Sequence, residues 1–499
     1  MSSKKSSIAR IWKLFSAHEK RNIAIYIAGI MLYKFGLEAF NGSIVTLAAN
    51  RYDQEAFHSN GTIRTFERVG LLSGLNQAFQ CIGSILIAPL AKRWPTRTVL
   101  SISIFVFAIF SAVLMIVDTA TGGYIKPKDF VQIDEHDYRY YGKYNTNGII
   151  PIYCITGIAF GMVELIRRVI PRDIVGDNPE KLQKMDALVH IFYEIAGVSG
   201  AFTTGLGLIP RLGNNYSFII TPILFTLAAI VWLFISYCKS IVQGFLLFIQ
   251  SFCIGAKIIF THRKFIWIWS CYALTLYAHR YLENGIAPQI AKRYLEQSEW
   301  SQIIVGASNF GELLGAAFIR RINLTSCLVY SFFYPPANNV KYAWIIAATY
   351  IPIGFGSAAD DIALNSFIQS SLSGLESKHK NISALGAVAS FLYSSYIIIY
   401  AILNPVLGIY IDRVYDTTDS VRPAFLYTVA VQMTIISAIV LVSTLIPKGA
   451  LSCNPTLIPD EDISLIRSPK ESSVGHNDRE EISKGNNHKE IAPELETYF

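Results

Sequence analysis

Residues 33–52 read YKFGLEAFNGSIVTLAANRY, and residues 281–294 read YLENGIAPQIAKRY. Both segments carry Leu-Glu, then Asn-Gly, then Ala-x-Arg-Tyr, in the same order. The segments that follow them also match, because Gly83 and Gly311 each precede a basic pair that begins nine residues later. Each match is weak alone. Together, in matching order, they indicate that the chain consists of two related halves.

The composition is that of a membrane protein. Of the 499 residues, 52% are hydrophobic and only 16% are charged, against about 25% charged in soluble domains. Apolar runs of about 20 residues, which is the length of helix that crosses a hydrocarbon core of about 30 Å, recur along most of the chain. Because lipid offers no hydrogen-bond partner to the backbone, these runs predict α-helices. The net charge of +7 comes from Lys and Arg in short loops, so it indicates no nucleic-acid partner.

We predict an all-α polytopic fold with twelve transmembrane helices in two six-helix halves. The first six spans cover about residues 23–49, 69–91, 98–117, 148–169, 187–208 and 216–237. The second six cover about residues 265–289, 300–319, 322–334, 342–370, 384–411 and 424–446. The ninth helix is unusually short, since 13 residues reach only about 20 Å.

Five segments follow from this plan. They are a cytosolic N-terminal segment (1–21), a first bundle (22–237), a connector (238–264), a second bundle (265–446) and a disordered cytosolic tail (447–499). The connector is apolar enough for a thirteenth crossing. Gln243, Gln250 and Lys257 interrupt it, which favours a helix lying along the cytoplasmic interface.

The distribution of Lys and Arg among the loops predicts that both termini are cytosolic. The sequons that begin at Asn60 and Asn215 then face outside. The N-terminus is basic and lacks an apolar core, so it is not a removable signal peptide. We expect an integral multi-pass protein of the plasma membrane or the vacuolar membrane.

Two six-helix halves joined by an interfacial connector resemble the major facilitator superfamily, over about residues 20–447. The chain is similar to uncharacterised fungal members. The superfamily has a cytoplasmic loop motif, roughly Gly-x-Leu-Ala-Asp-Arg-x-Gly-Arg, after its second span. This chain matches it at Leu90-Ala91, Arg93 and Arg97, but has Lys92 in place of the Asp and Pro95 in place of the Gly. The resemblance implies alternating access, and the loop usually latches one conformational state.

Charged residues in the middle of a span cost about 2.5–3.5 kcal/mol each, so they usually face an interior cavity. Lys34 and Glu38 are four residues apart and share one helix face, either as an internal salt bridge or as a cavity pair with Glu38 carrying a proton. His279 and Glu283 are also four apart, either in the cavity or at the outer interface. The candidates for proton coupling or for the cavity wall are Lys34, Glu38, Glu164, His279, Arg280, Glu283, Glu312, Asp360 and Asp361.

Uncharged polar residues inside the spans are candidates for contact with the cargo. They are Asn76, Gln77, Gln80 and Asn309. The alternative for those of the second span is hydrogen bonding between neighbouring helices. His190 and Glu194, near the cytoplasmic end of the fifth span, are as well explained by an interfacial position.

Other classes of protein lack support. No P-loop, HExxH or Gly-x-Ser-x-Gly motif occurs, so we expect neither an ATP-driven pump nor an enzyme. The seven cysteines show no disulfide or metal-ligand spacing, and we expect no metal and no cofactor. The sequence predicts a monomeric secondary active transporter in the lipid bilayer that binds a small-molecule substrate and protons. The alternative is a non-transporting membrane sensor or scaffold on the same fold.

Overall fold

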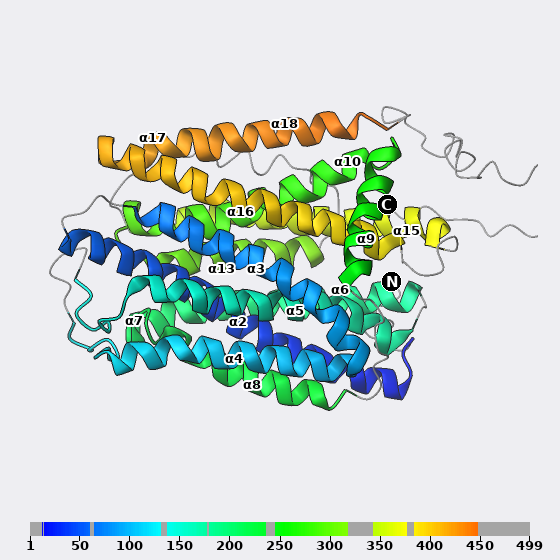
Figure 1. Ribbon diagram of the computed structural model, residues 1–499, viewed down its shortest axis with the longest axis horizontal. Helices are drawn as coiled ribbons and strands as arrows, with labels where there is room; N and C mark the ends of the chain where they lie inside the picture. Colours follow the sequence, from blue (N-terminus) through cyan, green and yellow to red (C-terminus); the bar gives the residue numbers. More distant parts are fainter. Residues whose placement is uncertain are drawn as a thin grey trace, which may run out of the picture.

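The computed structural model describes residues 12, 14–59, 64–130, 137–176, 179–235, 245–317, 343–376 and 384–447. These residues form helices joined by short connections and contain no strand. Most helices run along one direction, as in a bundle (Figure 1). The start of the first long helix and the end of the last helix lie at the same end of this bundle (Figure 1).

The first half starts at a strong helix-initiation signal. The Ser16 hydroxyl accepts a hydrogen bond from the backbone N–H of Glu19, and the Glu19 carboxylate accepts one from Ser16 N–H, which is a capping box. The helices of this half are α2 (Ala17–His58), α3 (Thr65–Arg93), α4 (Thr96–Ala120), η1 (Thr146–Gly148), α5 (Ile149–Val175), α6 (Pro179–Thr203), η2 (Thr204–Leu208), α7 (Ile209–Leu212), η3 (Ser217–Ile219) and α8 (Ile220–Leu233).

The second half contains several π-helical turns, which interrupt its helices at η4, η5, η6 and η8. Its elements are α9 (Phe245–Thr261), α10 (Ile266–Trp269), η4 (Ser270–Leu274), α11 (Thr275–Tyr281), η5 (Leu282–Ile286), α12 (Ala287–Gln289), η6 (Ile290–Tyr294), α13 (Trp300–Ala317), α15 (Ala343–Glu376), α16 (Ala384–Thr418), α17 (Arg422–Phe425), η8 (Leu426–Val431) and α18 (Gln432–Thr444).

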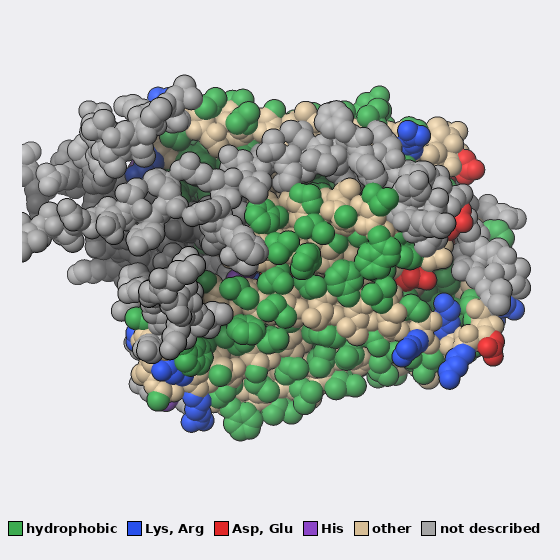
Figure 2. Space-filling model, turned by 180° about the vertical axis from the view of Figure 1, so that it is seen from behind, with side chains coloured by type: hydrophobic (Ala, Val, Ile, Leu, Met, Phe, Trp, Pro, Cys, Tyr) green, Lys and Arg blue, Asp and Glu red, His purple; other side chains and the backbone are tan. Residues whose placement is uncertain are grey.

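The protein is an integral multi-pass membrane protein. Hydrophobic side chains cover the middle of the bundle, whereas charged side chains gather toward its ends (Figure 2). Outward-facing residues such as Ile116, Ile223 and Leu441 are more than half exposed, as expected for side chains that face lipid. Five described segments are long and apolar enough to cross a membrane, at Ala17–His58, Thr96–Ala120, Thr146–Arg167, Ala387–Thr418 and Arg422–Thr444.

The count of twelve spans stays a prediction. The short ninth helix predicted at 322–334 lies outside the described residues, as do the tail 448–499, the segment 1–11 and residue 13. Helix α9, within the predicted connector 238–264, runs crosswise to the bundle at the end where the first long helix starts (Figure 1). It packs against α16 and α3. The boundaries of the five predicted segments stay predictions.

Glycines set the same close helix contact in both halves. A β-carbon added at Gly83 of α3 would lie 2.0 Å from the carbonyl oxygen of Ile158 in α5. A β-carbon added at Gly311 of α13 would lie 2.0 Å from the carbonyl oxygen of Ile351 in α15. Glycine therefore lets each pair of backbones touch. The two glycines that match in sequence have equivalent neighbours in space.

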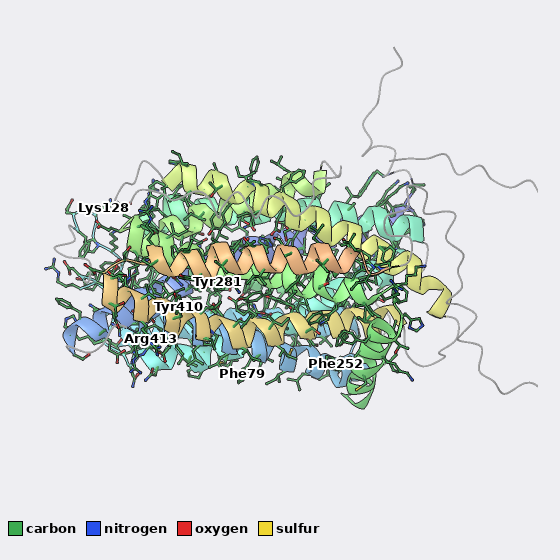
Figure 3. The ribbon with its side chains drawn as sticks, turned by 90° about the horizontal axis from the view of Figure 1, so that it is seen from above. Phe79, Lys128, Phe252, Tyr281, Tyr410 and Arg413 are labelled. Carbon is green, nitrogen blue, oxygen red and sulfur yellow. The ribbon has the colours of Figure 1, made fainter. Side chains whose placement is uncertain are left out.

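The two halves meet through α3 against α16 and through α6 against α13. Lys128 and Arg413 lie toward one end of the bundle and Phe252 toward the other, with Tyr281 between them (Figure 3). We call the first of these the 121–145 end, after the connection that lies there, and the second the α9 end.

Candidate functional site

A cluster of charged side chains lies buried where the two halves meet. Lys34 and Glu38, one turn apart on α2, form an ion pair, and their side chains are 3% and 10% exposed. The Lys34 ammonium also lies 4.6 Å from the centre of the Tyr193 ring of α6. A charge can be held at this depth because an opposite charge and an aromatic face replace its water.

His279 of α11 is the centre of the cluster in the second half. Its Nε2 lies 3.0 Å from Oε1 of Glu283 and 3.2 Å from Oε1 of Glu312. Its Nδ1 lies 2.8 Å from the Ser357 hydroxyl of α15. The Arg280 guanidinium binds the other oxygen of Glu283 at 2.8 Å. All three acidic and imidazole side chains are almost fully buried, so this stretch of helix is packed inside the protein.

The cluster continues across the two halves. The buried carboxyl groups of Glu312 in α13 and Glu194 in α6 lie close enough to interact, and Glu194 is only 1% exposed. Beside it, the missing side chain of Gly197 leaves room for Lys34, because a β-carbon there would lie 2.6 Å from Lys34 Cε and 3.4 Å from Nδ2 of Asn309. Lys34, Asn309 and the two carboxyl groups are therefore close neighbours from both halves.

Other predicted residues lie elsewhere in the first half. Glu164 pairs with Arg167 at 2.6 Å and accepts a hydrogen bond from Tyr33 at 3.2 Å. Asn76 donates to the carbonyl oxygen of Tyr153 at 2.7 Å, and Gln80 donates to Asn76 at 2.8 Å. These two amides link α3 to α5. Gln77 Oε1 is buried without a hydrogen-bond partner.

Four predicted residues have side chains outside the described part of the structure. Asp360 and Asp361 lie within α15, and Lys92 and Arg93 end α3, but all four side chains are outside the described set. Arg97, the last member of the loop motif, donates to the carbonyl oxygen of Ile235 at 2.6 Å.

A second ionic contact joins the halves at the 121–145 end. The Asp53 carboxylate of α2 lies 2.8 Å from Lys292 Nζ and 3.1 Å from the Arg293 guanidinium, both in η6. The Thr65 hydroxyl also donates to Asp53. Lys292 donates further to Asn50 Oδ1 at 2.9 Å. Asp53 therefore holds two cations of the opposite half in a site from which water is excluded.

The connection 121–145 covers this contact. The Asn50 side chain donates to the Tyr141 hydroxyl and to the Ser298 hydroxyl, each at 3.2 Å. Burial raises the pKa of Tyr141 to about 12, so the phenol stays neutral and keeps its role as a hydrogen-bond partner at physiological pH.

A third contact between the halves uses a helix terminus. The Asp412 carboxylate of α16 accepts the backbone N–H of Phe66 at 3.1 Å and of Glu67 at 2.6 Å. Both donors are in the first turn of α3, where N–H groups lack partners within the helix and the helix dipole favours a negative charge. The two halves thus contact each other through charged groups at two separate places near the 121–145 end.

Sequence reasoning missed Asp53, Lys292 and Asp412 as functional candidates. A signal for two of them was present, since Lys292 lies inside the repeated Ala-x-Arg-Tyr and Asp53 directly follows its first copy. For Glu194 the sequence supports an interfacial position as well as an interior one, because its depth depends on how α6 crosses the bundle.

Residues 26–388 match the Major Facilitator Superfamily. The fold is similar to that of a mutant form of the nucleoside transporter NupG, with 13% identity, a TM-score of 0.56, and coverage of 84% of this chain and 99% of that one. It is also similar to the D-xylose-proton symporter, with 11% identity, a TM-score of 0.55, and coverage of 85% and 97%.

A third similar structure is the partially occluded inward-open conformation of XylE from E. coli, with 12% identity, a TM-score of 0.54, and coverage of 86% and 97%. Curated proteins include no sequence match. The resemblance noted from the two halves is confirmed at the level of the superfamily, and its similarity to fungal members stays a prediction. The chain belongs to the Major Facilitator Superfamily.

Proposed function

We propose that this protein is a proton-coupled secondary active transporter of a small solute that works by alternating access. The observation that carries the proposal is the division of charge between the halves. One buried ionic cluster spans their junction through Glu194 and Glu312, and a separate ion pair closes one end through Asp53 and Lys292. A site between two halves with a breakable contact at one end is what a rocking transporter needs.

Alternating access would proceed by separation of the halves at the 121–145 end. Opening there requires Asp53 to leave Lys292 and Arg293, and Asp412 to leave the first turn of α3. Leaving one buried charge without its partner costs about 3–5 kcal/mol, so the ionic contacts must be exchanged for water or for other partners as the end opens. We assign the conformation described here to the state that is closed at that end.

Proton coupling is assigned to Glu38. Its carboxylate is held by one cation, Lys34, on the same helix. Protonation of Glu38 removes that ion pair and leaves the Lys34 ammonium beside Asn309 without its counter-charge. Loss of the proton restores the ion pair. Binding of a proton and binding of cargo are therefore linked through one ammonium group.

We place the 121–145 end outside the cytosol and both termini in the cytosol, with the protein acting as a monomer in the plasma membrane or the vacuolar membrane. The excess of Lys and Arg in alternate loops supports this orientation. Protease protection of terminal tags in sealed membranes tests it.

The function is tested with purified protein in sealed vesicles that carry an imposed pH gradient. The first panel of solutes includes a nucleoside and D-xylose, the cargoes named for two structural neighbours, and continues with metabolites that change in cells that lack the protein. Glu38→Gln is expected to abolish uphill transport of the solute while the protein still inserts in the membrane. Glu296→Gln, at an exposed carboxylate, is the control. Unchanged uphill transport by Glu38→Gln, with the same pH dependence, would exclude Glu38 as the proton carrier.

The sensor or scaffold alternative is separated in the same vesicles. It predicts saturable binding of a solute without any flux, whereas the transporter proposal predicts flux that the pH gradient drives.

A further inference from the structure

Three buried ligand-type atoms converge on one point in the second half. They are Nε2 of His279, a carboxylate oxygen of Glu283 and a carboxylate oxygen of Glu312, and all lie within 4.8 Å of one another. The side chains of His279 and Glu283 are 3% and 2% exposed, and that of Glu312 is 11% exposed. One imidazole and two carboxylates at this spacing are the donors and the geometry of a first-row metal site.

Some of these atoms lack the hydrogen bonds that burial demands. Glu283 Oε1 lies 3.0 Å from His279 Nε2, yet it accepts no hydrogen bond of good geometry. Glu194 Oε2, on the neighbouring carboxyl group of the opposite half, also has none. A buried carboxylate oxygen without a partner is costly. The Glu283 oxygen faces the histidine without a well-formed hydrogen bond, so it is available to bind a cation at this point.

The ligands are also held in place by a second layer of contacts. Ser357 binds Nδ1 of His279 at 2.8 Å, which orients the ring so that Nε2 faces both carboxylates. The Ser308 hydroxyl lies 3.1 Å from Nε2 and places one more oxygen beside the ligands. Arg280 binds the second oxygen of Glu283 at 2.8 Å and leaves Oε1 directed at the histidine. Metal-binding histidines and carboxylates are typically oriented by such partners.

We propose that His279, Glu283 and Glu312 bind one divalent first-row transition-metal cation at the junction of the halves, where it is the transported cargo. The mixed nitrogen and oxygen donor set suits Mn²⁺, Fe²⁺ or Zn²⁺ better than Mg²⁺ or Ca²⁺, which prefer oxygen donors alone. Binding of the cation stands on the geometry, whereas its role as cargo rests on the proposed function. Sequence spacing alone does not reveal the site, because its third ligand comes from a different span.

Binding is tested on the full chain, purified in detergent without a polyhistidine tag. Equilibrium dialysis against Mn²⁺, Zn²⁺ and Mg²⁺ is expected to give one tightly bound Mn²⁺ or Zn²⁺ per chain, and Mg²⁺ binding at least about 100-fold weaker. The electron paramagnetic resonance spectrum of bound Mn²⁺ provides a readout that does not depend on transport.

Variants locate the cation. Glu312→Gln removes the negative charge of one ligand and His279→Gln removes the imidazole nitrogen, and each is expected to weaken Mn²⁺ binding by at least about 100-fold. Ser357→Ala removes an orienting partner and is expected to weaken it about 10-fold to 100-fold. Asp118→Asn, at a buried carboxylate bound to Asn215, and His18→Gln are the matched controls and should bind as the wild type does.

Several outcomes would overturn the proposal. The proposal is wrong if monodisperse wild-type protein binds no Mn²⁺ or Zn²⁺ at micromolar concentration. Binding that survives both ligand substitutions would also overturn it. Proton-driven flux of an organic solute by metal-free protein would remove the cargo assignment while leaving the proposed transport function intact. Uptake of Mn²⁺ into vesicles, lost in Glu312→Gln and kept in Asp118→Asn, would support both.

Discussion

Asp53 of α2 and Lys292 of η6 belong to opposite halves, yet only 2.8 Å separates Oδ2 of one from Nζ of the other. Their side chains are 1% and 8% exposed. The residues of the repeated Ala-x-Arg-Tyr segments thus meet each other at the 121–145 end. A buried ion pair adds little to the free energy of unfolding, but separating its two charges leaves each of them buried without a partner, which is costly. We therefore regard this pair as a latch between conformations.

Asp53→Asn is expected to open the 121–145 end more often, because Lys292 and Arg293 lose the charge that holds them. The measurement uses a protein without native cysteines in which Ser298→Cys introduces a single cysteine. The rate at which a maleimide modifies this cysteine reports how often the end opens. Ser298 is 9% exposed and bonds to Asn50 at 3.2 Å. We expect labelling at least about 10-fold faster. Asp137→Asn, at a carboxylate that pairs with Arg139 two residues further along the chain, should not change it. Equal rates for both variants would contradict the latch.

Asp412→Asn and Asp412→Ala should differ in their effects. The asparagine oxygen can still accept one of the N–H groups of Phe66 and Glu67, but it loses the attraction of a negative charge to the helix terminus, worth about 0.3–1 kcal/mol. Alanine loses the cap as well, at a cost of about 0.5–2 kcal/mol. The same cysteine assay should therefore rank alanine above asparagine and asparagine above wild type. The reverse order would show that Asp412 does not hold the end closed.

Gly311→Ala and Gly83→Ala should each lower the thermal stability of the protein in detergent. The added methyl group meets a backbone carbonyl at 2.0 Å in both cases, and backbone cannot move aside as a side chain can. Overpacking of this kind costs about 1–3 kcal/mol. Gly148→Ala, which meets nothing within 4 Å, is the control. Thermal unfolding midpoints that stay at the wild-type value would exclude the close contact.

Asn215 should carry no N-linked glycan, although it begins a sequon. Its side chain is buried, and Nδ2 donates to Asp118 Oδ2 at 2.9 Å and to the carbonyl oxygen of Tyr124 at 3.2 Å. The nitrogen that would bear the sugar is already used. Asn215→Gln is expected to leave the glycosylated mass unchanged in intact-protein mass spectrometry. A loss of one glycan mass would contradict this arrangement.

The fold could be predicted from the sequence largely because hydrophobic length and a repeated pattern are local properties. Gly83 and Gly311 show this most clearly, since a match found by counting residues turned out to be the same helix contact in space. Helix ends were less predictable. Helix α2 runs from Ala17 to His58, past both ends of the predicted span 23–49, because apolar length measures the lipid core and not the helix.

The candidate site could be predicted only where its members are close in the chain. Lys34 with Glu38 and His279 with Glu283 share helix faces, so spacing was enough to find them. Glu194 and Asp412 act on residues of the opposite half, more than 100 positions away. Such contacts depend on how α6 and α16 cross the bundle, which periodicity does not contain. Glu164, which the sequence predicts for proton coupling or the cavity wall, pairs with Arg167 in the structure, and its role stays a prediction.

The π-helical turns of the seventh span link the two sites in a way that rigid halves would not. Glu283 lies in η5, and Lys292 lies in η6, one short α-helical segment further on. A π turn holds one residue more than an α turn. If η5 tightened to an α turn, every residue after it would rotate by about 100° about the helix axis relative to His279. A one-residue change of register at Glu283 would thereby turn Lys292 away from Asp53. Occupancy of the site formed by His279, Glu283 and Glu312 can in this way be transmitted along a single helix to the Asp53–Lys292 latch.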